Sequence, residues 1–215
     1  DGTEKNPDRV RAVLRSYARN ISTMTTASTI MGDVRANDIS ITDKTLSNYL
    51  TALRRLFIIE DVKAWQPSLR SRTGIRTSDK RHFVDTSIAT AILELNPKSV
   101  LEDFELFGFL FEDFCLRDIR VYTELLRGTV YHYHDNSNLE ADLIIRLHDG
   151  RWAAIEVKTG SKEIEEAAEN LITLSNEVNT SKIGSPSFLM VLTAGQYAYR
   201  REDGVYVVPI GCLKP

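Results

Sequence analysis

"LEADLIIRLHDGRWAAIEVKTG", residues 139–160, decides the fold because it predicts two β-strands joined by a tight turn. Apolar side chains recur at every second position of residues 139–147 and again in residues 152–158, which is the period of a β-strand. The His-Asp-Gly stretch between the two segments is typical of a turn. The sequence therefore predicts a β-hairpin.

The second face of this hairpin carries charged residues at positions where apolar ones could stand. Asp142 lies on that face of the first strand, and Glu156 and Lys158 share a face of the second strand. If the turn closes, Asp142 comes near Glu156, and two carboxylates and one ammonium gather at one spot. Hard divalent cations prefer such oxygen ligands. The pattern predicts that Asp142 and Glu156 bind Mg²⁺ or Mn²⁺ and that Lys158 assists a water in phosphodiester hydrolysis.

A metal-dependent hydrolase of this kind would use Lys158, Glu156 and Asp142 as its catalytic residues. The same pattern also suits a solvated hairpin face on which Glu156 and Lys158 pair for solubility, without catalysis. Glu140 shares the face of Asp142 and is either an accessory acid or an exposed edge residue. The residues alone leave both interpretations open.

The hairpin lies within a longer pattern of alternating elements. Strand-like segments occur at residues 130–134, 187–194 and 205–210, and an amphipathic helix is expected at residues 162–178. Before them, residues 100–126 are apolar almost all round, which predicts a buried helix. This order predicts an α/β fold class with one mixed sheet.

The chain has 215 residues, of which 42% are hydrophobic, and this is enough for two modest domains. The Asn-Pro-Lys-Ser stretch at residues 96–99 breaks the helical pattern. We therefore expect one domain in residues 1–95 and a second in residues 96–215.

The first of these domains is predicted to be largely helical. Residues 7–20, 25–38 and 43–55 place apolar side chains at helical spacing, and residues 57–65 then change to strand-like composition. Helices followed by a strand and a basic loop are the order of a winged helix-turn-helix. We expect such a fold in the N-terminal half.

Two groups of residues in this half predict contacts with DNA. The polar face of the helix at residues 43–55 suits a nucleic-acid groove, and the basic loop after residue 65 would neutralise phosphates. Winged helices also mediate protein contacts, and the loop also suits a solvated connector or a docking surface. The predicted contact residues are Lys44, Asn48, Arg54, Arg70, Arg72, Arg76, Lys80 and Arg81.

The overall composition excludes several classes of protein. A net charge of −3 gives no global basic signal, so nucleic-acid binding requires a local patch. Two cysteines far apart in the sequence, Cys115 and Cys212, exclude a disulfide framework and a thiolate zinc site. No apolar run is long enough to cross a bilayer, so we expect a cytoplasmic location and no membrane partner.

Asp142, followed by Ile-Glu-Val-Lys with Glu156 and Lys158, resembles the motif of the PD-(D/E)XK nuclease superfamily. The resemblance implies a restriction-endonuclease-like mixed-sheet domain. It also implies that Glu112, in the Gly-Phe-Leu-Phe-Glu-Asp-Phe stretch, completes the metal site from the helix before the sheet. Ala141 stands where this superfamily often has proline. The alternatives for Glu112 are a buried acid paired with an arginine such as Arg117 or Arg120, or a helix residue at a sheet edge.

A wider resemblance covers essentially the whole chain. The segments RRLFIIED, KRHFVD, GFLFEDF, EADLII and IEVK are similar to the C-terminal region, of unknown function, of bacterial AAA-type ATP-binding proteins. In those proteins an ATPase domain with a P-loop precedes this region. This chain contains no GxxxxGK[ST] stretch, so ATP would bind only through such a preceding domain.

Two functions follow as hypotheses from this reasoning. The first is a DNA-directed module of an AAA-type ATPase, with a winged helix that grips DNA and a Mg²⁺-dependent nuclease-like site that cleaves it. The second is a non-catalytic regulatory or docking tail of the ATPase that keeps a remnant nuclease fold. Both have the ATPase domain as a partner, and both are compatible with an oligomer.

Overall fold

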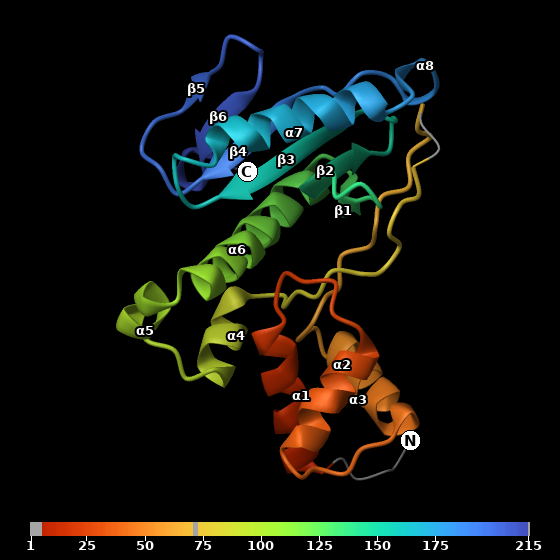
Figure 1. The fold of residues 1–215 in the computed structure, drawn as a ribbon, viewed down its shortest axis with the longest axis vertical. Helices are drawn as coiled ribbons and strands as arrows, with labels where there is room; N and C mark the ends of the chain where they lie inside the picture. Colours follow the sequence, from red (N-terminus) through yellow and green to blue (C-terminus); the bar gives the residue numbers. More distant parts are fainter. Residues whose placement is uncertain (1–5, 71–72, 215) are drawn as a thin grey trace. The chain divides into compact units, whose positions relative to one another are not determined.

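The computed structural model describes residues 6–70 and 73–214, and the chain divides into two compact units (Figure 1). Unit 1 comprises residues Asp1–Asp61 and Ser78–Asp113, and unit 2 comprises Val62–Thr77 and Phe114–Pro215. The units are therefore interleaved along the sequence. The domain boundary expected after residue 95 falls inside unit 1.

Unit 1 is helical, and its helices begin where short polar side chains cap them. The side chain of Asn6 accepts from the backbone N–H groups of Asp8 and Arg9, and that of Thr42 accepts from Thr45. Helix α1 packs on α2, α3 and α4. The helices are α1 (Pro7–Arg19), α2 (Ala27–Ala36), α3 (Asp43–Arg55), α4 (Thr86–Ile92), α5 (Pro97–Glu102) and the first part of α6 (Phe104–Leu125).

The core of unit 1 is apolar, with Val13, Tyr17, Ile30 and Leu46 all buried. The ring of Tyr17 meets that of Phe83 edge to face, with centroids 5.2 Å apart. These contacts confirm the helical pattern expected for residues 7–55. They also place the segment around Phe83 against the helices.

The wing expected after α3 is not confirmed as a pair of strands. Within residues 6–70 and 73–214, Ile59 and Phe83 form one isolated antiparallel bridge, supported by the hydrogen bond from the Glu60 N–H to the His82 carbonyl. Most of the segment between these residues does not stay with unit 1, because residues 62–70 and 73–77 pack in unit 2.

Residues 62–70 and 73–77 belong to unit 2, and the part around Ala64 lies beside β1 (Gly128–His134). The Trp65 N–H donates to the His132 carbonyl at 2.7 Å, and the His132 N–H donates to the Lys63 carbonyl at 3.1 Å. The Trp65 ring lies 4.9 Å from that of Trp152. Burial of this aromatic pair holds the segment to the sheet, which explains why it does not form a free wing.

Unit 2 contains a six-stranded mixed sheet of order β1-β2-β3-β4-β6-β5, which confirms the predicted α/β class. Strands β1 to β3 are antiparallel, β4 runs parallel to β3, β6 runs parallel to β4, and β5 is antiparallel to β6. The remaining strands are β2 (Glu140–Leu147), β3 (Trp152–Lys158), β4 (Leu189–Thr193), β5 (Tyr199–Arg200) and β6 (Tyr206–Pro209).

The crossover from β3 to β4 is made by α7 (Ile164–Glu177), which packs on β2, β3 and β4 (Figure 1). Ala168 and Leu171 of α7 are fully buried in one cluster with Ile144 and Ala154 of the strands. The short helix α8 (Thr180–Ile183) follows, and a 3₁₀ turn at Ile210–Cys212 comes after the last strand. One face of the sheet is therefore covered by α7.

The predicted β-hairpin is present as β2 and β3. Gly150 closes the turn with φ of +92°, a conformation that glycine adopts without strain. The sequence pattern separated an apolar face from a charged one, but Ile144, Ala154 and Trp152 on the charged face are buried as well. Both faces of the hairpin are therefore interior, and the carboxylates on it are not on a solvated surface.

The helix expected over residues 100–126 is two helices, α5 and α6, separated at Asp103. This residue leaves the helical region with φ of −126° and ψ of 85°. Cys115 and Leu116 of α6 are buried, whereas Phe104 and Leu125 at its two ends are exposed. The prediction of burial thus holds for the middle of the helix only.

Candidate functional site

Strands β2 and β3 place Asp142, Glu156 and Lys158 on one face of the sheet. Leu143 pairs with Ile155 in antiparallel register, so Asp142 and Glu156 occupy the adjoining positions of the two strands. Cross-strand neighbours share a face, as do residues two apart on one strand. The structure therefore brings together the three residues that the sequence pattern predicted as catalytic.

Side-chain geometry fixes the two carboxylates in different ways. Asp142 Oδ2 accepts a hydrogen bond of 2.8 Å from the Val157 N–H, which anchors this side chain to β3. Lys158 Nζ lies 3.1 Å from Glu156 Oε2. The Glu156 side chain is 0% exposed and that of Lys158 is 26% exposed. The site is thus largely buried, and Lys158 is its member nearest to solvent.

The carboxyl of Glu156 lacks a complete set of partners. Among the residues that the structure describes, no donor hydrogen-bonds to its Oε1 atom. Burial raises the pKa of Glu156 well above its ordinary range, and the neighbouring Asp142 raises it further, while Lys158 opposes the shift. A buried carboxylate with an unsatisfied oxygen lowers the stability of the fold. Such a carboxylate is a candidate ligand for a cation.

Lys158 is held as a cation. Burial lowers the pKa of its ammonium, but Glu156 and then Asp142 act in the opposite direction more strongly, and the net pKa is raised above its ordinary value. Lys158 is therefore a hydrogen-bond donor and a positive charge at neutral pH. It is not suited to act as a general base.

The donor set matches a hard divalent cation in part. Two adjoining carboxylates, Asp142 and Glu156, supply oxygen ligands, and Mg²⁺ commonly completes such a shell with water. Across the described part of the chain, no group of three or more His, Cys, Asp or Glu residues is arranged to hold a metal. The set thus fits an oxygen-ligated, partly hydrated cation better than a structural zinc.

Glu112 belongs to unit 1, and its ion pair is with a lysine. Its Oε1 lies 2.7 Å from Lys80 Nζ and 3.9 Å from His82 Nε2. Among the arginines considered from the sequence, Arg117 pairs with Asp118 at 2.8 Å. One internal partner of Glu112 is thus Lys80, one of the residues expected to contact DNA. A metal-binding role for Glu112 stays a prediction.

Thr193 is a neighbour of the site that the sequence did not single out. It pairs with Lys158 in the parallel register of β3 and β4, and its Oγ1 accepts from the Gly195 N–H at 3.2 Å. Both strands end here, and ligand sites in α/β sheets lie beyond the carboxyl ends of parallel strands. Only the strand order could have pointed to Thr193.

The residues expected to contact DNA from α3 and its neighbourhood differ in availability. Lys44 and Asn48 are exposed on α3. Arg54 and Arg81, however, both bind the carboxylate of Asp61, with Arg81 Nη1 3.1 Å from its Oδ2. Together with Lys80 on Glu112, three of the predicted contacts are internal ion pairs.

The predicted contact residues of the basic loop after residue 65 also differ in their surroundings. Arg70 Nη2 donates to Thr180 Oγ1, and Arg76 Nη2 donates to Asn138 Oδ1, each at 2.7 Å, so both side chains are tied to unit 2. Arg72 lies outside the described residues. Lys80 belongs to unit 1. The structure thus does not place these cations in one compact unit.

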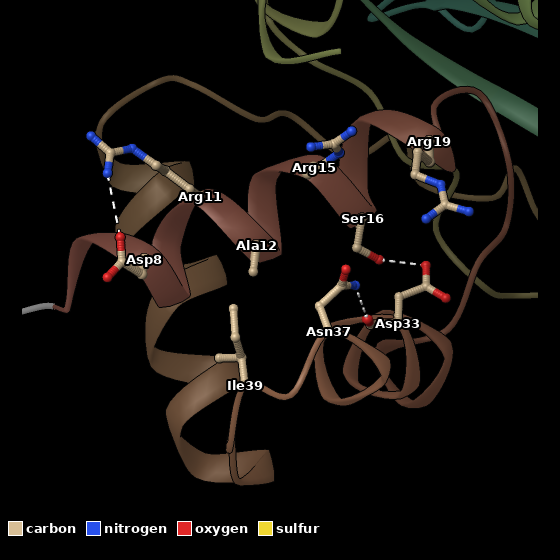
Figure 2. Close-up of a pocket in the computed structure, with 9 residues that line it drawn as sticks. All are labelled: Asp8, Arg11, Ala12, Arg15, Ser16, Arg19, Asp33, Asn37 and Ile39. Carbon is tan, nitrogen blue, oxygen red and sulfur yellow. Dashed lines mark hydrogen bonds and ion pairs between the residues drawn. The ribbon is translucent and has the colours of Figure 1, made fainter.

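A different set of cations lies on α1. Arg11, Arg15 and Arg19 line one hollow of about 420 Å³, together with Ile39 and other residues of unit 1 (Figure 2). The sequence signal was the recurrence of arginine every four residues, on the face of the helix opposite to its apolar stripe.

Comparisons with known proteins divide the chain in two. Residues 2–99 match a model of a domain of unknown function (DUF8612), and residues 107–213 match a second one (DUF4143). The two halves are similar to different families. DUF4143 domains are found in AAA-associated proteins, so the C-terminal half is similar to an AAA-associated region.

One solved structure is similar over most of the chain. It is a half-complex from a tetradecameric assembly of Thermococcus gammatolerans McrB AAA+ hexamers with bound McrC. The identity is 11%, the match covers 93% of this chain and 70% of the other, and the TM-score of 0.33 is too low to show a shared fold. The search of curated proteins found no match. Among the described residues, no helix is long and apolar enough to span a membrane.

Proposed function

We propose that this chain is a DNA-directed module of an AAA-associated protein and that unit 2 hydrolyses phosphodiester bonds with Mg²⁺ or Mn²⁺. The observation that carries the proposal is the Glu156 carboxyl, fully buried beside Asp142 with an oxygen that no described donor satisfies. The order α6-β1-β2-β3-α7-β4 supports it, because a helix followed by a mixed sheet is the order that the resemblance to PD-(D/E)XK nucleases leads us to expect.

The chain's own residues divide the work. Asp142, anchored by the Val157 N–H, and Glu156 would hold the cation. When bound, the cation supplies a Lewis acid that polarises the phosphate and makes water more acidic. Lys158, kept protonated by the two carboxylates, would orient the attacking water and offset negative charge as the phosphorus gains its fifth oxygen. The water oxygen forms a new P–O bond and one P–O ester bond breaks. The attacking water gives up one proton to bulk water, and the leaving oxygen takes one proton from bulk water.

A plasmid-nicking assay with Mg²⁺ or Mn²⁺ tests this proposal. We expect Glu156→Gln to lower the rate by at least about 100-fold, because it removes a charged metal ligand from a site where even outer-shell partners matter. Glu169→Gln, an exposed acid on α7, is the matched control and should nick like the wild type. Equal rates for wild type and Glu156→Gln at matched purity would show that the chain does not cleave DNA through this site.

A second function, a non-catalytic docking tail of the ATPase with a remnant nuclease fold, is favoured by one observation. No third His, Cys, Asp or Glu joins Asp142 and Glu156 in a metal-binding group within the described residues. Fold alone does not establish catalysis. This function predicts that calorimetric titration of Mn²⁺ gives the same absence of heat for wild type and Asp142→Ala. It also predicts stimulation of ATPase activity when the chain is joined to its ATPase domain.

A further inference from the structure

We propose that the arginine row of α1, Arg11, Arg15 and Arg19, binds the phosphodiester backbone of a nucleic acid. Four residues make about one turn of a helix, so the three side chains lie on one face. They line a hollow of about 420 Å³ that Ile39 and Asn37 border, and Figure 2 shows all five side chains around it.

The row is fixed by the packing of the rest of α1. Val13 and Tyr17 on the other face of the helix are 0% exposed and bury it in the core of unit 1. Because that face is committed to the core, the arginines are directed outward. A rigid helix thus presents three guanidinium groups at fixed spacing, over about 12 Å from Arg11 to Arg19.

The guanidinium groups of this row are available to a ligand. Within the part of the chain that the structure describes, neither Arg15 nor Arg19 has a hydrogen bond or ion pair. Arg11 contacts Asp8 at 3.4 Å, but both side chains are about 80% exposed, and such surface pairs are weak. In contrast, Arg54 and Arg81 are engaged by Asp61.

Two acids line the hollow beside the arginines, Asp8 and Asp33, and each accepts a hydrogen bond from a side chain of α1. Asp33 of α2 accepts a hydrogen bond of 2.7 Å from Ser16 Oγ and a longer one from Asn20 Nδ2. These bonds tie α2 to α1 and build the wall of the hollow. Asp33 therefore acts as part of the scaffold, and Arg15 and Arg19 carry the positive charge that a ligand would meet.

The shape of the row indicates the class of ligand. Arginine binds phosphate through two parallel hydrogen bonds, and a row of about 12 Å is longer than one phosphate group. A strand with successive phosphates fits such a row, and contacts of this kind position a nucleic acid without reading its sequence. The inference rests on the proposed function in taking nucleic acid as the polyanion, and it moves the expected DNA contact from α3 to α1.

Fluorescence anisotropy of a labelled DNA duplex, with the 215-residue chain in EDTA, tests the inference. We expect the triple variant Arg11→Gln, Arg15→Gln and Arg19→Gln to bind at least about 10-fold more weakly. The slope of log K against log salt should fall in magnitude by about 2.7, since each phosphate contact contributes about 0.9. The triple Arg→Lys variant keeps the charge and should recover part of the affinity, which excludes a folding defect.

Two comparison variants locate the effect. Lys98→Gln, Arg151→Gln and Lys182→Gln together remove the same charge from exposed positions elsewhere and should bind like the wild type. Lys44→Gln with Asn48→Ala tests α3. The inference would be overturned if this α3 variant loses affinity for DNA while the triple Arg→Gln variant of α1 does not. It would also be overturned if the wild type binds tripolyphosphate but no DNA.

The outcome also separates this inference from the proposed function. If Glu156→Gln abolishes nicking while the α1 variant keeps wild-type affinity, the arginine row is not the contact and the nuclease proposal stands. If the α1 variant loses affinity while Glu156→Gln nicks like the wild type, the arginine row is the contact and the nuclease proposal is wrong.

Discussion

Asp61 of unit 1 and Glu156 of unit 2 are both buried carboxylates, yet their surroundings are opposite. Asp61, 5% exposed, accepts from Tyr17 and Arg54 and pairs with Arg81. Burial raises the pKa of Asp61, but these three partners outweigh it, and the pKa is lowered. Glu156 has an unsatisfied oxygen and a second acid beside it, and its pKa is raised. Asp61 stabilises the fold, whereas the charged form of Glu156 destabilises it.

This difference teaches how to interpret a buried charge. Where every oxygen has a partner, the charge is part of the architecture, and its arginines are not free to bind a ligand. Where an oxygen of a buried carboxylate lacks a partner, the residue does not stabilise the fold. A functional role then explains its presence better than a structural one. Urea unfolding of substituted chains separates the two cases.

The largest effect is expected for Asp61→Ala. It leaves Arg54 and Arg81 without their shared partner, and the buried Tyr17 hydroxyl keeps the longer hydrogen bond of 3.4 Å to the His82 carbonyl. We expect the free energy of unfolding at pH 7 to fall by about 3 kcal/mol. A loss below about 1 kcal/mol would show that Asp61 is not a structural carboxylate.

The pH dependence of this loss follows from the lowered pKa of Asp61. A group with a lowered folded pKa contributes stability above its unfolded pKa, about 3.9, and loses it as the pH falls through the folded value. The difference between wild type and Asp61→Ala should therefore shrink as the pH is lowered from 5 to 2. A difference that stays constant over this range would contradict the assignment.

The opposite sign is expected for Glu156→Gln. A carboxyl with a raised folded pKa contributes stability below its unfolded pKa, about 4.3, and this contribution is lost as the pH rises through the folded value. The variant removes the buried charge, and we expect it to be about 1–2 kcal/mol more stable than the wild type at pH 8. The two chains should converge near pH 4, whereas Glu169→Gln should follow the wild type throughout. If Glu156→Gln is less stable than the wild type at pH 8, Glu156 belongs with Asp61 as a structural residue.

The smallest effect on stability is expected for the arginine row of α1. Among the described residues, the side chains of Arg15 and Arg19 have no hydrogen-bond or ion-pair partner, so replacing them with glutamine breaks no such interaction. The free energy of unfolding should change by less than about 0.5 kcal/mol, even as DNA affinity falls. A larger loss would mean that these side chains support the fold, and it would weaken the case for a ligand.

The sequence was informative wherever a local pattern decides the structure. The period of two in residues 139–158 predicted β2 and β3, and it also predicted that Asp142, Glu156 and Lys158 share a face. The helix expected at residues 43–55 is present as α3 with the same bounds, because its apolar side chains recur at helical spacing. These features depend on residues a few positions apart, so a local stretch of sequence is enough to predict them.

It was less informative wherever partners are distant. Arg81 meets Asp61 and Lys80 meets Glu112 across 20 and more residues, and no periodicity reports such pairs. The segment around Trp65 belongs to unit 2 because Trp65 is buried against Trp152, which lies far away in the sequence. The arginines of α1 were visible as a pattern, but a charged helix face is usually only solvated.

A crystal soaked in Mn²⁺ at about pH 7.5 tests the central claim most directly, because anomalous scattering locates the metal without any assay of activity. The account predicts an anomalous peak between the carboxylates of Asp142 and Glu156 in the wild type, and no peak there in Glu156→Gln crystals soaked identically. Wild-type crystals without a peak between these carboxylates would contradict it.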